Sequence, residues 1–407
     1  MLDIKFIRKN PKLVAEKAKQ KGFDVDVDKL LKVDEVRRKL IEEVDSLRAK
    51  RKEIAQKRGQ KEGTKLKGEL RQKENELEGV NEEFYGLIRQ VPNLPKDDVP
   101  TGHDENDNVV IRKVGKVPKF SFKPKDHLEL GLGLDLIDIE RAVKISGPRF
   151  AFLKNELVKL EFAIIGFVVD EIKQEGFIPV IPPAIVNQKA IEGLGYPEYQ
   201  TGEGYRLDDQ YLVGTAEHSL VPMHMDEVFD KKDLPRRYVA FSPSYRREAG
   251  SYGKDTKGIF RVHQFDKVEM VSFVLPSDED REHDYLLSLQ EKVVKSLSLP
   301  YRVVNVCTSE LGFPTAQKFD LEIWLPSQGK YRETHSASTT GSFQSRRLNI
   351  KYKDVQGESS YVAILNATAF AIGRTIIAIM ENFQQKDGSI LIPKALQKYT
   401  GFAKIPA

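Results

Sequence analysis

The amino-acid sequence predicts an α+β protein in which an N-terminal antiparallel helical hairpin precedes a strand-rich domain with helices packed on it. Two observations carry this prediction. Apolar residues recur every seven positions between residues 28 and 91, on both sides of a break that contains glycines. Beyond about residue 100, short strand-like runs are interspersed with amphipathic helices. We therefore expect two domains, at 1–100 and 101–407.

The helical hairpin is predicted from its seven-residue beat. The apolar positions are Val33, Leu40, Leu47 and Ile54 in the first helix, and Leu70, Leu77, Phe84 and Val91 in the second. Between them lies "RGQKEGTKLKG", whose three glycines we expect to form the turn. This pattern predicts two long helices packed as an antiparallel coiled coil.

The end of this hairpin is basic. Residues 48–73 hold eleven basic side chains and three acidic ones, whereas residues 74–83 are acidic. A charged coiled-coil surface often serves solubility alone. A projecting arm with a positive end also fits contact with a phosphate backbone. Charge alone leaves both interpretations open.

Composition limits the classes of function. Lys and Arg total 65 against 61 acidic residues, so the net charge of +4 is modest. The single cysteine, Cys307, excludes an internal disulfide and a zinc site built from several cysteines, which favours a reducing, cytoplasmic compartment. No stretch has the about 20 apolar residues that cross a bilayer. The N-terminus lacks the apolar run of a signal peptide. We therefore expect no membrane partner.

The second domain begins after a polar linker, "VPNLPKDDVPTGHDENDN". A long amphipathic helix is predicted at about 150–175 and another at about 280–297. Strand-like runs include "RYVAF", "KVEMVSFVL" and "YRVVNV". The order of the strands in a sheet is not readable from these runs.

The segment "SYRREAGSYGKDTKGIFRVHQFDKVEM", residues 244–270, is unusual for a core strand. Alternation along a strand predicts that Arg246 and Glu248 share one face. It groups Arg261, His263, Phe265, Lys267 and Glu269 on another. A solvated edge hairpin is one interpretation, and a polar binding site is the other.

Charge chemistry favours a site for ATP and a small amino acid. Arg246 offers a planar fork of donors to a phosphate or carboxylate, and Arg374 lies in an apolar helix where an idle charge is costly. Phe265 offers a flat face to a nucleobase, and Glu217 or Glu269 an anionic partner for an ammonium group. The sequence contains no Walker loop or dinucleotide fingerprint.

Three segments resemble the motifs of class II aminoacyl-tRNA synthetases. They are "QEGFIPVIPPAIV", "SYRREAGSYGKDTKGIFRVHQF" and "NATAFAIGRTIIAIMENFQQKDGSILIPKAL". Within that class, "GTAEHSL", "HQFDKVEM" and "ETHSASTTGSFQSRR" resemble segments of the seryl-tRNA synthetases, as does the basic hairpin. The resemblance covers nearly the whole chain. It implies an antiparallel β-sheet catalytic domain flanked by helices, with an N-terminal coiled-coil arm.

The resemblance implies a serine–tRNA ligase. Such an enzyme activates L-serine with ATP to seryl-adenylate plus pyrophosphate, then transfers the seryl group to the 3′ end of tRNA(Ser). A selenocysteine tRNA, tRNA(Sec), is a further candidate acceptor. Catalytic roles fall on Arg246, Glu248 and Arg374, with Arg246 bridging the α-phosphate and the serine carboxylate.

Binding roles are implied residue by residue. The ATP set is Arg246, Arg247, Glu248, Val262, Phe265, Glu333, Thr334, His335, Ser336 and Arg374, with Mg²⁺ held by Glu333 and Ser336. The serine set is Thr215, Ala216, Glu217, Arg246, Glu269 and Thr368. The chain departs from the usual pattern at Ala367, Thr368 and Ala369, and at Thr334 and His335.

The resemblance also implies partners. A homodimer is expected, with the first motif forming much of the interface. The arm is expected to grip the tRNA through Arg48, Arg51, Lys52, Lys57, Arg58, Lys61, Lys65 and Lys67. Two alternatives are an amino acid:carrier-protein ligase, against which the basic arm argues, and an idle RNA-binding scaffold, against which the intact charged residues argue.

Overall fold

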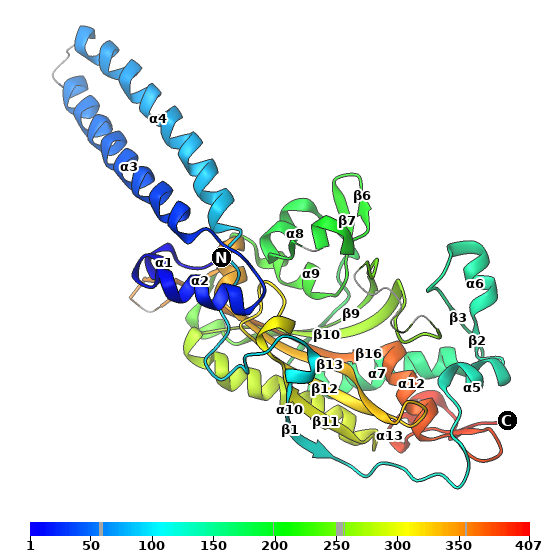
Figure 1. The fold of residues 1–407 in the computed structure, drawn as a ribbon. Coiled ribbons are helices and arrows are strands. Elements are labelled where there is room, and N and C mark those ends of the chain that lie inside the picture. Colours follow the sequence, from blue (N-terminus) through cyan, green and yellow to red (C-terminus); the bar gives the residue numbers. More distant parts are fainter. Residues whose placement is uncertain (57–59, 198, 250–254, 256, 355) are drawn as a thin grey trace. The chain divides into compact units, whose positions relative to one another are not determined.

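The computed structural model describes residues 1–56, 60–197, 199–249, 255, 257–354 and 356–407 (Figure 1). Its chain divides into two compact units, Met1–Leu94 and Pro95–Ala407. The sequence places this boundary a few residues later, at 100. The polar segment after Leu94 belongs with the second unit because the Lys96 N–H donates to the Ala316 carbonyl (3.0 Å) and the Lys96 ammonium pairs with Glu279 (3.0 Å).

The first unit contains the predicted coiled-coil hairpin. Its helices are α1 (Ile4–Lys9), α2 (Pro11–Gln20), α3 (Val27–Gln56) and α4 (Gln60–Ile88). Val44, Leu47 and Leu70 form the buried seam between α3 and α4. A second cluster at the base joins α1 and α2 to the hairpin, with Ile7 and Phe84 at its centre. The prediction that the apolar residues spaced seven apart form the packing surface is thus confirmed.

The turn of the hairpin differs from the prediction. Gly63 and Gly68 lie inside α4, which begins at Gln60, while Gly59 lies outside the described residues. A glycine inside a helix costs about 1 kcal/mol relative to alanine. The apolar seam continues past Gly68 to Leu66, which lies between the two glycines, so tertiary packing favours a helix here.

The second unit is built on an eight-stranded sheet in the order β1-β11-β12-β13-β16-β10-β9-β4. All neighbours are antiparallel except β4 and β9. The strands are β1 (Val109–Val114), β4 (Ile178–Val180), β9 (Arg236–Tyr245), β10 (Gln264–Val274), β11 (Tyr301–Asn305), β12 (Gln317–Leu325), β13 (Lys330–Gly341) and β16 (Ala363–Ala371). This is the predicted antiparallel catalytic domain.

Helices α7 (Glu156–Gln174), α10 (Glu279–Ser296) and α12 (Ile372–Asn382) pack on this sheet (Figure 1). They bury the largest apolar core, to which β10 contributes Val268 and Met270. Because strand side chains alternate, Phe265, Lys267 and Glu269 point to the opposite face of β10. That face is where the polar site lies.

Shorter elements complete the second unit. They are α5 (His127–Gly133), β2 (Ile137–Asp138), α6 (Ile139–Ser146), β3 (Phe152–Leu153), β5 (Ile185–Asn187), α8 (Gln188–Leu194), β6 (Arg206–Leu207), β7 (Gln210–Leu212), α9 (Glu217–Leu220), β8 (Val228–Asp230), α11 (Phe343–Leu348), β14 (Lys351–Lys353), β15 (Ser359–Tyr361), β17 (Ile390–Leu391), α13 (Lys394–Thr400) and β18 (Lys404–Ile405).

The long helix α7 starts later than predicted. Phe152 and Leu153 pair with β2 instead, and Asn155 has a left-handed backbone (φ 52°) that separates this strand from the helix beginning at Glu156. The predicted helix at 280–297 matches α10 closely. Within the described chain, no helix combines the length and apolar character that crossing a membrane requires.

Candidate active site

A pocket of about 400 Å³ opens on the polar face of the sheet. Strands β10, β13 and β16, helix α12 and the segment between β9 and β10 all contribute to it. Its lining consists of Glu203, Arg246, Glu248, Ile259, Phe260, Arg261, Val262, Phe265, Lys267, Glu333, Thr334, Ser336, Thr368, Ala371, Gly373 and Arg374. The fold therefore brings together segments of the chain that are far apart in sequence.

Arg246 stands directly after β9 and is fixed from two sides. Its backbone N–H donates to the His263 carbonyl (2.9 Å), and its Nε donates to the Gly214 carbonyl (3.1 Å). The guanidinium lies 5.4 Å from the centre of the Phe265 ring, close enough for a cation–π contact. The pocket thus presents a positioned cation beside a flat aromatic face.

Glu248 reaches the pocket by a different route than strand alternation predicts. Strand β9 ends at Tyr245, and Glu248 has a left-handed backbone (φ 52°). Its carboxylate accepts a hydrogen bond from Arg261 Nη1 at 2.6 Å. Arg261 itself precedes β10, which begins at Gln264. The two side chains are therefore held together by an ion pair and not by a shared strand face.

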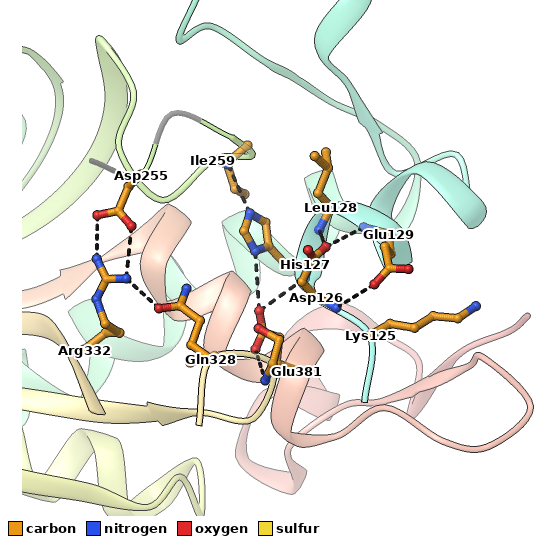
Figure 2. Close-up of polar contacts among 12 residues, drawn as sticks. Lys125, Asp126, His127, Leu128, Glu129, Asp255, Ile259, Gln328, Arg332 and Glu381 are labelled. Atoms are coloured by element: carbon orange, nitrogen blue, oxygen red, sulfur yellow. Dashed lines mark hydrogen bonds and ion pairs between the residues drawn. The ribbon is translucent and has the colours of Figure 1, made fainter. Parts of the chain in front are cut away.

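The segment between β9 and β10 is anchored to neighbouring elements (Figure 2). The backbone N–H of Ile259 donates to His127 Nε2 (3.2 Å), and His127 Nδ1 lies 3.5 Å from the fully buried carboxylate of Glu381. A Cβ on Gly258 would lie 2.0 Å from His127 Nε2, and its φ of +73° also favours glycine. His127 thus fixes the backbone that leads into Phe260, Arg261 and Val262.

A second anchor holds the same segment by charge. Arg332 donates two hydrogen bonds to Asp255, at 3.0 and 2.5 Å, and a third to Gln328 (2.6 Å), as Figure 2 shows. Burial alone would raise the pKa of Asp255, but hydrogen bonding and the positive charge of Arg332 lower it. The Arg332 guanidinium also lies 4.0 Å from the centre of the Phe260 ring.

Arg374, on α12, closes the other side of the pocket. Its Nη1 donates to the Glu333 carbonyl (3.0 Å), and its guanidinium lies 4.7 Å from the centre of the Phe260 ring. Nη1 also lies 3.4 Å from the Glu333 carboxylate. Burial would raise the pKa of Glu333, but the charges of Arg374, Lys318 and Arg246 outweigh it and lower the pKa to about 2. This carboxylate is ionised at neutral pH.

A bulge in β13 decides which neighbours of Glu333 reach the pocket. Glu333 pairs with Glu322 and His335 with Leu321, so Thr334 is the extra residue. Glu333, Thr334 and Ser336 line the pocket. His335 turns into the core, where its ring lies 5.2 Å from that of Phe370 and burial lowers its pKa to about 3. The lining thus lacks His335, one of the residues assigned to ATP.

Oxygen donors for a cation gather at this end. Glu333 supplies a carboxylate and Ser336 a hydroxyl, the ligand types that Mg²⁺ uses beside phosphate oxygens. Across the described residues, no group of three or more His, Cys, Asp or Glu side chains is arranged to hold a metal ion. The pair therefore fits a cation that takes its remaining ligands from substrate and water.

The residues assigned to the amino acid lie deeper. Thr215, Ala216, Glu217 and Glu269 are all buried, and none is part of the lining. The Glu217 carboxylate accepts hydrogen bonds from Tyr196 (2.9 Å) and Gln344 (2.8 Å). Burial raises the pKa of Glu217.

Thr368 connects this deeper region with the pocket. It faces Glu269 across the β10–β16 pair and lines the pocket, with its hydroxyl 3.5 Å from that of Ser336. Ala369 is the extra residue of a bulge at this point, and both Ala367 and Ala369 are fully buried. The added methyl groups are therefore accommodated in the core.

The remaining assigned residues whose side chains the structure describes are exposed. Arg247 lies 5.8 Å from the centre of the Tyr205 ring and does not line the pocket. On the arm, Arg51, Lys52, Lys65 and Lys67 are exposed, and Arg48 pairs with Glu74 at 2.8 Å. Lys57 and Arg58 lie outside the described residues, as does the side chain of Lys61.

Sequence reasoning gave no binding role to several lining residues, among them the charged Glu203 and Lys267. Lys267 carried a usable signal, because alternation places it between Phe265 and Glu269 on the same strand face. Glu203 comes from a different part of the chain, and no local pattern connects it with the site.

Comparison with known proteins defines the class. Residues 201–383 match the model of the tRNA synthetase class II core domain (G, H, P, S and T), and residues 1–95 match that of the seryl-tRNA synthetase N-terminal domain. The second unit is therefore a class II aminoacyl-tRNA synthetase core. A serine–tRNA ligase of Dictyoglomus turgidum is 43% identical over 421 residues, covering 100% of this chain and 99% of the relative. The chain belongs to the seryl-tRNA synthetase family.

Solved structures agree with this assignment. A seryl-tRNA synthetase from Pyrococcus horikoshii complexed with ATP has a TM-score of 0.94 and 40% identity, with full coverage of both chains. A cytoplasmic serine–tRNA ligase from Naegleria fowleri in complex with AMP has a TM-score of 0.90 and 30% identity, covering 100% of this chain and 99% of that one.

Proposed function

We propose that this protein is a serine–tRNA ligase that activates L-serine with ATP and transfers the seryl group to tRNA(Ser). The observation that carries the proposal is the convergence of Arg246, Glu333 and Arg374 on one pocket beside Phe265. Two cations around an aromatic face suit a nucleoside triphosphate, and the family membership gives the amino acid.

In the first step, a serine carboxylate oxygen attacks the α-phosphorus and pyrophosphate leaves. Arg246 holds both reacting groups, because its guanidinium can donate to the serine carboxylate and to the α-phosphate together. Its fixed Nε contact with Gly214 preorganises this geometry. Phe265 and the backbone at Val262 bind the adenine with Glu248, and Arg374 binds the other adenine face or the γ-phosphate.

Mg²⁺ is proposed as the cation of this site. When bound, it would neutralise charge on the phosphates. Glu333 and Ser336 are the residues that would hold it, because their oxygens line the pocket and the Glu333 carboxylate is ionised.

Serine binds among Thr215, Ala216, Glu217, Glu269 and Thr368. Buried groups that hydrogen-bond a hydroxyl discriminate strongly against alanine, which would leave them unpaired. In the second step, the 3′-hydroxyl of the terminal tRNA ribose attacks the seryl carbonyl and AMP leaves.

The arm is proposed to bind tRNA outside the catalytic pocket. Arg51, Lys52, Lys65 and Lys67 support this role because they are exposed on a coiled coil with a positive end. A reducing cytoplasmic compartment is proposed from the single buried cysteine, Cys307.

A homodimer is proposed from the apolar surface around the first motif. Phe162 on α7 is 67% exposed and Ile181, directly after β4, is 82% exposed; α7 contacts β4, and Ile178 in β4 and Ile185 in β5 are exposed as well. Large exposed apolar side chains that gather in one region are typical of protein interfaces. Isologous dimers bury such a region against its own copy.

Amino-acid-dependent ATP–pyrophosphate exchange tests the proposal. When the standard amino acids are supplied one at a time, only serine should support exchange. Charging of total tRNA should then yield seryl-tRNA. Exchange with another amino acid and none with serine would contradict the specificity. Serine exchange with no charging of tRNA would point instead to a carrier-protein ligase.

A further inference from the structure

Lys267 occupies a position that the proposed mechanism does not use. It lies on β10 between Phe265 and Glu269 and is 7% exposed. Its Nζ lies 3.1 Å from the Thr215 hydroxyl and 2.5 Å from a Glu269 carboxylate oxygen. Both contacts are with residues assigned to the amino acid.

Lys267 lies where the ATP pocket meets the residues assigned to the amino acid. Lys267 lines the pocket, whereas Thr215 and Glu269 lie behind it. On the ATP side, the polar contacts of the Arg246 side chain and backbone are with Gly214 and His263. Lys267 therefore belongs to the amino-acid half, although its side chain is reached through the ATP pocket.

The charge balance of the amino-acid half depends on this lysine. Burial raises the pKa of Glu269, and the charge of Lys267 is the largest opposing effect, followed by that of Arg246. Burial also raises the pKa of Glu217, which Glu269 raises further and Lys267 lowers. The neighbouring His218 supplies no charge at neutral pH because burial lowers its pKa to about 3.

We propose that Lys267 is a positioning residue for serine recognition. Its ammonium fixes the Glu269 carboxylate and the Thr215 hydroxyl in a receiving orientation before the amino acid arrives. This inference rests on the proposed function and deepens it. It assigns to Lys267 the binding of the amino acid and not that of ATP.

A purely structural role for the ion pair explains Lys267 less well than a role in serine binding does. Replacing a buried ion pair by apolar residues is often neutral or stabilising, so stability does not require a charge here. Lys267 instead places its charge where two serine-binding groups and the pocket meet.

The test compares Lys267→Met with Lys267→Arg in serine-dependent ATP–pyrophosphate exchange. Met retains an unbranched side chain without the charge, and Arg retains the charge. We expect Lys267→Met to raise the KM for serine about 10- to 100-fold, the range for loss of a charged hydrogen bond. The KM for ATP should stay within about twofold, and Lys267→Arg should recover much of the loss.

The pH profile of kcat/KM for serine is a second measurement, because loss of a purely structural contact would not change it. Without the lysine charge, the pKa of Glu269 should rise further, because burial raises it and the charge of Lys267 is the largest opposing effect. In Lys267→Met, kcat/KM for serine should therefore rise with pH over a range where the wild type is flat. An equal rise in both KM values, or an unchanged KM for serine with a flat profile, would overturn the proposal.

Two controls separate this result from other failures. Lys353→Met removes an exposed strand lysine on β14 and should leave both KM values unchanged. If thermal unfolding shows that Lys267→Met is not folded, Lys267→Gln is compared with Lys267→Arg instead. Of these two variants, only Lys267→Arg should bind serine well. Wild-type protein without serine exchange would refute the proposed function itself, independently of these variants.

Discussion

The histidine anchor of the ATP pocket gives a sharp prediction. Replacing His127 by Phe keeps a ring of similar size but removes the acceptor for the Ile259 N–H. Ile259 is 5% exposed, so water cannot readily replace that acceptor. A buried donor left unpaired costs about 1–3 kcal/mol. Glu381 retains two backbone donors, from His127 and Ser327, so the damage should stay local.

This penalty should appear in ATP binding. Ile259, Phe260 and Val262 line the pocket, so freeing their backbone weakens the adenine side of the site. At about 1.4 kcal/mol per tenfold change, the KM for ATP should rise about 5- to 150-fold. The KM for serine should change little, because none of the contacts of Thr215 or Lys267 involves His127.

The assay is ATP–pyrophosphate exchange at saturating serine and varied ATP, with thermal unfolding measured in parallel. His127→Gln is the matched variant, since its side-chain oxygen can accept from the Ile259 N–H and should restore much of the ATP affinity. The reasoning would be refuted by an unchanged KM for ATP in His127→Phe. It would also fail if Gln and Phe were equally impaired.

Four further outcomes are expected. Arg246→Ala should lower exchange by at least about 10²-fold. The unfolding temperature should not change, because the side chain's one hydrogen bond within the described structure is to the Gly214 carbonyl. Normal exchange would mean that the site is misplaced. Glu333→Gln should raise the Mg²⁺ requirement of exchange about tenfold. In the wild type this requirement should vary between about pH 5 and pH 8 only as much as the titration of ATP itself, measured without enzyme, accounts for, because the Glu333 pKa of about 2 keeps the carboxylate ionised throughout; a further titration in that range would contradict the assignment. Deleting residues 48–73 and joining the helices by a short linker should abolish tRNA charging and spare serine exchange, whereas equal loss of both would argue against a separate tRNA-binding arm.

Local patterns were enough for the elements whose packing is local. The coiled-coil hairpin followed from the seven-residue beat because residues seven apart lie on the same side of a helix. The glycine pattern was misleading at Gly63 and Gly68: it indicated a turn, but both lie inside α4, where Leu66 packs on the seam with α3. Packing across the hairpin outweighs a propensity of about 1 kcal/mol per glycine.

Alternation along strands placed some of the site, but it failed for Arg246 and Glu248, because β9 ends at Tyr245. It correctly grouped Phe265 and Lys267, which line the pocket, with Glu269, which pairs with Lys267. It could not foresee the bulge at Thr334 that turns His335 into the core, because a bulge is decided by how two strands pair.

The sequence by itself determined the fold class, the coiled-coil arm and the residue types of an ATP and amino-acid site, since these depend on spacing and chemical identity. The tertiary structure alone decided the strand order, in which β10 lies beside β16, and the contacts of Lys267 with Thr215 and of His127 with Ile259. Those contacts join segments that are distant along the chain, and only the folded sheet and its helices bring them within hydrogen-bonding distance.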